Sequence, residues 1–131
     1  MYTWVEHTAE LELRIAAPTE EAVFLDALEA FAELVADDGS ADAEREEVEI
    51  EASDRPALLA EWLNELVYLA DVRGFVPERL TELRLDGNTL RATLRGHRGR
   101  PRPIVKAVTL HRLVHEGDDA LGWHARVVLD V

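Results

Sequence analysis

The chain has 131 residues and contains no cysteine, one lysine and one methionine, and only 6% of its residues are aromatic. Without cysteine it can form no disulfide, no thiolate nucleophile and no zinc site of the cysteine type. Any metal would need histidine, carboxylate or carbonyl ligands. Apolar runs are short, and the first residues lack the basic and apolar regions of a signal peptide. We therefore expect a cytoplasmic protein without a membrane partner.

Basic residues are scarce in the first half of the chain. Residues 1–65 hold 19 acids and 3 bases, whereas residues 66–131 hold 8 acids and 11 bases, and the net charge is −13. A chain this acidic cannot bind RNA through its overall field, so contact with a polyanion would have to be local. The apolar content of 47% and the length suit one folded core. We predict a single domain over residues 1–131.

Two helices are predicted between segments with strand periodicity. Apolar residues recur at helical spacing from Thr19, a suitable N-cap, to about Ala36. A second helix is expected after Asp54 and Pro56, and Gly74 ends it.

Alternation of apolar and polar residues indicates strands in the remaining segments. Residues 2–16 suit one or two strands, and a turn at Asp86-Gly87-Asn88 suits a hairpin. Further strands are expected over residues 48–52, 104–114 and 121–131, with loops over residues 37–47 and 95–103. The order of elements predicts an α+β fold in which two helices pack on a mainly antiparallel β-sheet or sandwich.

Carboxylates at the two ends of the chain form the first candidate site. If the first and last strands are neighbours, Glu10, Asp130, backbone carbonyls and the terminal carboxylate of Val131 could converge on a cation. Oxygen ligands suit Ca²⁺, Mg²⁺ or Mn²⁺. The alternative is that Glu10 and Asp130 are ordinary outward-facing residues of half-exposed strands, and that nearby His7 is structural.

A run without acids between Asp86 and Glu116 forms the second candidate. Its bases can pair with phosphate or with an acidic partner, or they can simply balance the acidic first half as a solvated hairpin. We single out four arginines in it for contact with RNA or a partner: Arg95, Arg98, Arg100 and Arg102. Lys106 is the only lysine of the chain, which suggests that a compact ammonium is needed there; the alternative is that it occurs there by chance.

Motifs of independent catalysis are absent. The sequence has no nucleophile elbow, no serine beside a histidine, and no phosphate-binding or dinucleotide-binding glycine pattern. An enzyme is therefore not the expected class.

The chain resembles the archease family from end to end. Four segments carry the resemblance: Val5–Leu11, Glu61–Leu69, Val105–His111 and Val127–Val131. It implies a small α+β protein that is not itself a catalyst and that assists an RtcB-type RNA ligase in tRNA splicing or RNA repair. Such a ligase joins a 3′-phosphate or 2′,3′-cyclic phosphate end to a 5′-hydroxyl, using GTP and Mn²⁺. The helper promotes guanylylation of the ligase and multiple turnovers.

The resemblance also implies roles for particular residues. The metal-binding carboxylates of the family correspond to Glu10 and Asp130, with the backbone of Val131 nearby, and its functional lysine corresponds to Lys106. We add His7 as a second residue for ligase activation. RNA would be met only indirectly or through the arginine-rich segment.

Two positions depart from the family pattern. Glu10 stands where the family usually has aspartate, and Leu110 where tyrosine is common.

Two other functions remain open. A stand-alone metal-dependent hydrolase or nuclease would use Glu10 and Asp130 on its own substrate. A chaperone-like binding module would instead act through exposed apolar surface.

Overall fold

The computed structural model describes residues 1–131 as seven strands and two helices. In chain order they are β1 (Tyr2–His7), β2 (Glu10–Ala17), α1 (Glu20–Val35), β3 (Glu44–Glu51), α2 (Arg55–Arg73), β4 (Phe75–Asp86), β5 (Thr89–Arg98), β6 (Ala107–Asp118) and β7 (Gly122–Asp130). Neither helix combines the length and the apolar character that crossing a membrane requires.

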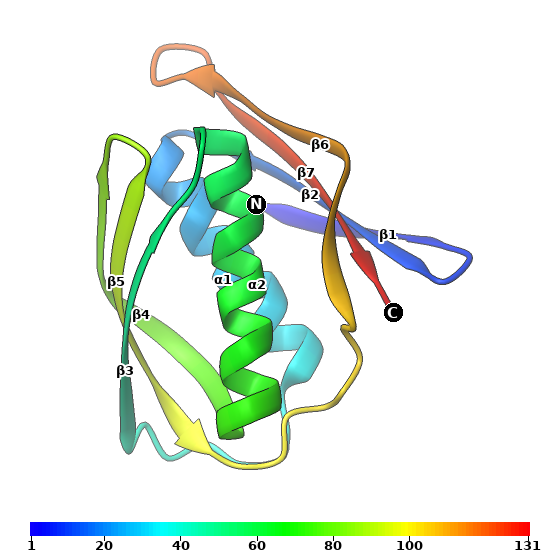
Figure 1. Cartoon of the computed structure of the whole chain (residues 1–131), viewed down its shortest axis with the longest axis vertical. Helices are drawn as coiled ribbons and strands as arrows, with labels where there is room; N and C mark the ends of the chain where they lie inside the picture. The colour runs from blue at the N-terminus through cyan, green and yellow to red at the C-terminus, as the bar shows by residue number, and fades with distance from the viewer.

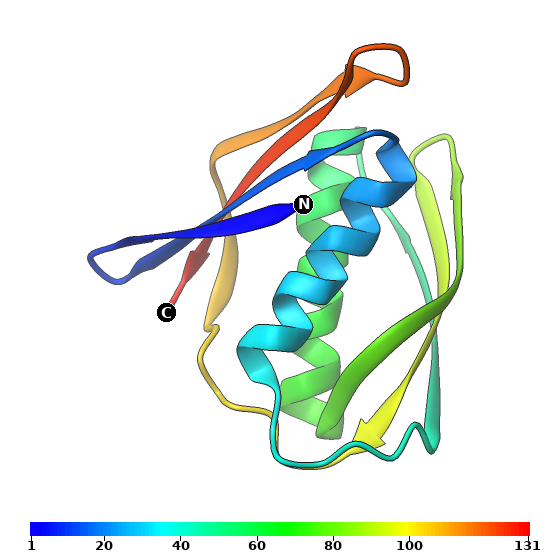
Figure 2. The ribbon, with the colours of Figure 1, turned by 180° about the vertical axis from the view of Figure 1, so that it is seen from behind.

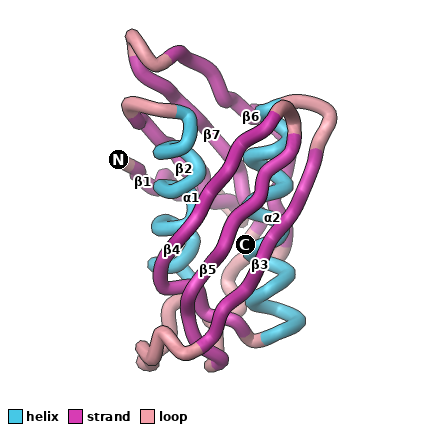
Figure 3. The backbone as a smooth tube through the Cα atoms, turned by 90° about the vertical axis from the view of Figure 1, so that its left-hand side faces the viewer, coloured by secondary structure: helices cyan, strands magenta, loops and turns pink.

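The strands form two antiparallel sheets with the helices between them. One sheet has the order β1-β2-β7-β6 and the other β3-β5-β4, and every pairing is antiparallel. In Figure 1 the three-stranded sheet lies on the left, the four-stranded sheet on the right, and α1 and α2 run between them. Figure 3 shows the three-stranded sheet from outside, with the helices behind it. The predicted α+β class is confirmed.

Both helices begin and end where the sequence predicts. The hydroxyl of Thr19 accepts a hydrogen bond from the Ala22 N–H at 3.2 Å, and the carboxylate of Asp54 accepts one from the Ala57 N–H at 2.8 Å. These bonds satisfy backbone donors that the first turn of a helix leaves free. At the end of α2, Gly74 has a φ of 63°, the left-handed conformation that glycine adopts without strain.

The strands differ more from the prediction. β3 begins at Glu44 and β5 continues to Arg98, so the expected loops over 37–47 and 95–103 are shorter than predicted. β4 spans Phe75–Asp86, so strand periodicity after Gly74 is confirmed. The sequence did not place its start, because bulges near Pro77 and Leu80 shift its register and disrupt the alternation. β6 spans Ala107–Asp118 and not 104–114.

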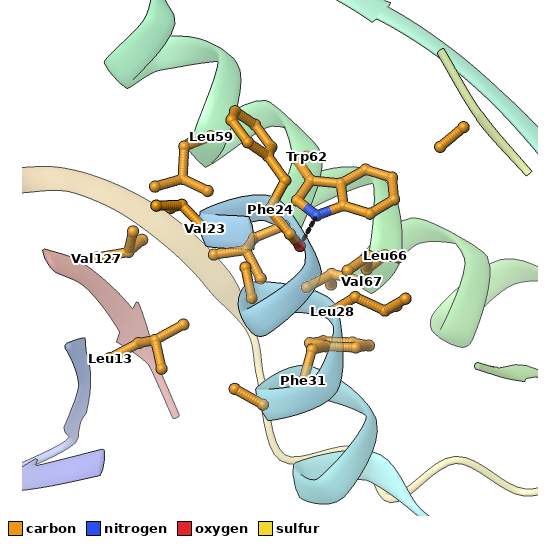
Figure 4. Close-up of a cluster of buried hydrophobic side chains, with 14 of the residues drawn as sticks. Leu13, Val23, Phe24, Leu28, Phe31, Leu59, Trp62, Leu66, Val67 and Val127 are labelled. Atoms are coloured by element: carbon orange, nitrogen blue, oxygen red, sulfur yellow. Dashed lines mark hydrogen bonds between the residues drawn. The ribbon is translucent and has the colours of Figure 1, made fainter. Parts of the chain in front are cut away.

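One hydrophobic core fills the layer between the sheets. It comprises 27 buried residues that come from both helices and both sheets. Figure 4 shows Phe24, Leu28 and Phe31 of α1 facing Trp62 and Leu66 of α2. The buried Trp62 indole donates a hydrogen bond to the Phe24 carbonyl at 2.9 Å, so its one polar atom is satisfied.

A buried histidine fastens the segment between α1 and β3. The two ring nitrogens of His97 each lie 2.8 Å from a carboxylate, one of Glu78 and one of Asp37. The backbone N–H of Arg100, and after it the hydrogen bond from His97, lower the pKa of Asp37 to about 2. The hydrogen bond from His97 is the largest cause that lowers the pKa of Glu78 to about 2. The same two carboxylates raise the pKa of His97 above 6.5, with the hydrogen bond to Glu78 the largest cause.

This arrangement predicts a pH dependence of stability. The pKa of His97 is raised in the folded state, so its contribution is fully present below pH 6.5 and is lost as the pH rises through the folded-state pKa. We expect the free energy of unfolding, measured by denaturant titration, to fall as the pH rises from 6.5 through the raised folded-state pKa of His97.

The fall should be absent in His97→Gln and retained in His111→Gln, since His111 is exposed. An equal fall in wild type and His97→Gln would show that His97 does not stabilise the fold as a cation.

Candidate functional site

Four strands bring most of the predicted site residues to one end of the four-stranded sheet. Direct cross-strand partners link His7 of β1 to Glu10 of β2, Glu10 to Asp130 of β7, and Asp130 to Ala107 of β6. Residues directly opposite each other on neighbouring strands share a face. His7, Glu10 and Asp130 therefore lie in one row on the outer face. We call this row, with Lys106 and Val131, the acidic end.

Two backbone hydrogen bonds join the last residues of the chain to the turn between β1 and β2 and to the residue before β6. The N–H of Val131 donates to the carbonyl of Ala9 at 3.2 Å, and the N–H of Lys106 donates to the carbonyl of Asp130 at 2.8 Å. Figure 2 shows the β1–β2 hairpin extending away from the helices, with the C-terminus close to it. The two chain ends that a shared cation site requires, around Glu10 and around Asp130, therefore lie side by side.

A bulge in β6 places an arginine over the acidic end. The pairing of β6 with β7 shifts register between Thr109 and Val114, and Arg112 in this bulge has a φ of 56°. A guanidinium nitrogen of Arg112 lies 3.1 Å from the Glu10 carboxylate. Sequence reasoning counted Arg112 only as one base of the acid-free run, because no local signal marks a bulge of this kind. The ion pair means that an incoming cation competes with Arg112 for Glu10.

Glu12 is a second carboxylate at this site, and sequence reasoning missed it. It follows Glu10 on the same face of β2, yet its side chain is only 3% exposed. Arg14 donates a hydrogen bond to it, while Arg112 and His7 approach it at 3.8 and 3.6 Å. Burial raises the pKa of Glu12, but the Arg14 hydrogen bond and these positive charges outweigh burial, so the pKa lies below its ordinary value. Glu12 is therefore a buried anion neutralised by its neighbours.

The donors at the acidic end suit a hard cation but do not form a complete shell. The available ligands are the carboxylates of Glu10 and Asp130 and the backbone oxygens nearby, and all of them are oxygen. No group of three or more histidine, aspartate or glutamate side chains is arranged to hold a metal ion. A cation here would thus rely on two carboxylates, main-chain oxygens and water.

Comparison with known proteins identifies the family. The sequence matches the archease protein family over residues 2–131. This chain belongs to the archease family. It is 31% identical to the archease of Pyrobaculum neutrophilum, over 99% of this chain and 95% of that protein. With the archease of Methanopyrus kandleri it shares 33% identity, over 97% and 96% of the two chains.

Solved structures of archease proteins have the same fold. Protein 1598 of Methanobacterium thermoautotrophicum, solved in solution, superposes with a TM-score of 0.77 at 29% identity, covering 99% of this chain and 98% of that one. A crystal structure from Thermotoga maritima, described as an archease and possible chaperone, gives a TM-score of 0.69 at 26% identity, covering 100% and 98%.

The four arginines proposed for contact with RNA or a partner do not form one basic surface in this archease. Arg95 pairs with Asp42 of the segment before β3, and Arg98 pairs with Glu46 of β3, so both are neutralised by nearby acids. Arg100 and Arg102 are exposed and form no ion pair; Lys106, at the acidic end, is likewise exposed. Their segment is also not a hairpin, because it crosses from β5 in one sheet to β6 in the other (Figure 1).

The turn at the acidic end carries a local strain that can be tested. Ala9 has a φ of 59°, a left-handed conformation that costs a residue with a Cβ roughly 1–2 kcal/mol. We expect Ala9→Gly to stabilise the archease by about 0.5–1 kcal/mol, since glycine removes this cost but loses more entropy on folding. Denaturant titration measures the change.

Ala16→Gly is the matched control. Ala16 is exposed on β2 and is not among the residues with positive φ, so glycine there should destabilise by roughly 0.5–1 kcal/mol. Equal destabilisation by both substitutions would contradict a strained Ala9.

Proposed function

We propose that this archease is a non-catalytic, cytoplasmic protein cofactor of an RtcB-type 3′-phosphate RNA ligase, and that it promotes guanylylation and turnover of the ligase in tRNA splicing or RNA repair. The observation that carries the proposal is the convergence of Glu10, Asp130, Val131 and Lys106 at the acidic end. These are the positions to which the archease resemblance assigns metal binding and ligase activation. They lie close together although Glu10 and Asp130 are far apart in the sequence.

The acidic end has a shape suited to entering a partner's active site. The β1–β2 hairpin extends beyond the helix layer and carries His7 and Glu10 at its turn (Figure 2). Lys106 is exposed beside it and forms no ion pair, so its ammonium is free to meet developing negative charge. The archease would stabilise a productive ligase conformation by binding it more tightly than other conformations.

A divalent cation at the acidic end belongs to this proposal. Glu10, Asp130 and the backbone oxygens of Val131 would hold it. Ca²⁺ suits them best because it accepts irregular oxygen shells, while Mg²⁺ demands near-octahedral geometry; Mn²⁺ remains a further candidate. When bound, such an ion would stabilise negative charge on a phosphate. Glu10 has a longer side chain than the aspartate usual in the family, so it can reach the ion from a strand position.

The exposed apolar side chains favour a specific partner over a general chaperone. The large ones lie in four separate places: Met1 at the N-terminus, Tyr68 and Val72 on α2, Leu110 in the β6 bulge, and Leu121 in the β6–β7 turn. A chaperone that acts on many clients needs a continuous apolar surface.

Competition between Arg112 and the cation gives the first test. Because its guanidinium pairs with Glu10, we expect Arg112→Gln to bind Ca²⁺ about tenfold more tightly than wild type in calorimetric titration. Glu10→Gln and Asp130→Asn should lose the binding. Arg91→Gln is the control, since Arg91 pairs with Glu49 on the other sheet. Unchanged affinity in Glu10→Gln would refute the metal site.

Ligase guanylylation gives the second test. We expect wild-type archease to accelerate GTP-dependent guanylylation of an RtcB-type ligase, and Lys106→Ala and Asp130→Ala to reduce this acceleration roughly tenfold or more. Arg102→Ala, which removes another exposed unpaired base, should retain it if RNA is met only indirectly. Full stimulation by both Lys106→Ala and Asp130→Ala would reject the proposed function.

A further inference from the structure

A pair of arginines occupies the middle of the outer face of the four-stranded sheet. Arg14 of β2 and Arg126 of β7 are direct cross-strand partners, and Thr3 of β1 and Val114 of β6 complete their row. Like charges directly opposite each other on neighbouring strands destabilise a sheet. Two guanidinium groups side by side therefore call for a compensating anion.

The protein's own anions compensate this pair only in part. Arg14 and Arg126 each use Nε for a hydrogen bond, to Glu12 and to the carbonyl of Arg112 respectively. The terminal nitrogens of both side chains make no hydrogen bond within the protein. Arg126 forms no ion pair although it is half-buried; the other bases without an ion pair, Arg100, Arg102 and Lys106, are exposed.

The arginine pair borders a hollow that contains no acid. The hollow has a volume of about 470 Å³, and its lining includes Arg14, Arg126, His124, Thr3 and Val114. No aspartate or glutamate lines it, although the chain has 27 acidic residues. Its lining also includes the apolar residues Ile15 and Ala16 of β2 and Ala125 of β7. Such a site combines positive charge with hydrogen-bond donors in a shallow hollow of the sheet surface.

We propose that this hollow binds the phosphate group of a nucleotide or of an RNA strand. The terminal nitrogens of Arg14 and Arg126 bind its oxygens, because a guanidinium presents paired donors that match phosphate geometry. The Nε bonds to Glu12 and Arg112 hold both side chains in place before the ligand arrives, which reduces the entropy lost on binding.

The phosphate site is distinct from the acidic end but shares its face. Arg14 lies four residues from Glu10 along β2, which corresponds to about 13 Å at about 3.3 Å per residue. A phosphate ester seated on the arginine pair can thus extend towards the acidic end along the sheet. The inference goes beyond the proposed function, because it requires neither the ligase nor a metal.

Titration of the full chain with inorganic phosphate tests the site. We expect saturable changes in the NMR signals of Arg14, Arg126 and Thr3, with sodium chloride at matched ionic strength causing none. Arg126→Gln should weaken phosphate binding about tenfold. Arg91→Gln, on the outer face of the other sheet, should leave it unchanged.

Two further variants separate binding from folding. Arg126→Lys keeps the charge but loses the paired donors, so it should bind phosphate more weakly than wild type while its thermal midpoint stays close to that of Arg126→Gln. Arg14→Gln should weaken binding independently, without removing the bond to Arg112 that supports the β6 bulge. Phosphate binding that persists in both Arg14→Gln and Arg126→Gln would overturn the proposal.

Competition identifies the source of the phosphate. Displacement of inorganic phosphate by GMP indicates a nucleotide, and displacement by a short oligoribonucleotide with a 3′-phosphate but not by its 3′-hydroxyl form indicates an RNA end. Either result supports the site, and failure of both to compete overturns it. Loss of ligase activation with intact phosphate binding would count against the proposed function alone.

Discussion

The register between β2 and β7 is the constraint on which the site depends. Glu10 lies opposite Asp130 because Leu13 lies opposite Val127, and both of these apolar residues are fully buried in the core. A shift by one residue would turn every side chain of β2 to the other face. The burial of apolar side chains thus sets the separation of two carboxylates on the outer face, and functional geometry and stability cannot be separated along this pair of strands.

Because this register is fixed, the outer face of the four-stranded sheet changes from acidic to basic along β2 and β7. Successive rows along β2 and β7 pass from Glu10 and Asp130, through buried Glu12, to Arg14 and Arg126. Most arginines elsewhere in the chain pair with nearby acids, as Arg73 and Arg98 do with Glu46. In a strongly acidic protein, most bases are already paired with the protein's own carboxylates. The few bases without such a partner mark the places where an external anion can bind.

The sequence predicted local features well and long-range ones poorly. Thr19, Asp54 and Gly74 mark helix ends because capping involves residues close along the chain. The start of β4 and the bulge in β6 depend on pairing with distant strands, and periodicity alone does not reveal them. The neighbouring positions of Glu10 and Asp130 required the further assumption that the first and last segments pair.

The same limit applies within the site. Alternation placed Glu12 on a solvent-facing side of a strand, whereas the fold buries it beneath Arg14 and Arg112. Whether an outward position is exposed depends on what a bulge elsewhere places over it. Which arginines are paired and which are free was also unpredictable, because the acids that pair with Arg95 and Arg98, Asp42 and Glu46, are more than 50 residues away in the sequence.

The position of Arg112 has a consequence for the protein without ligand. By contacting Glu10 and approaching Glu12, its guanidinium acts as a built-in counter-ion for two negative charges that lie close together on one strand. Their mutual repulsion is therefore balanced internally. The hairpin that bears them can hold its conformation before any external ion arrives, and an ion that binds replaces an existing charge partner instead of creating order where there was none.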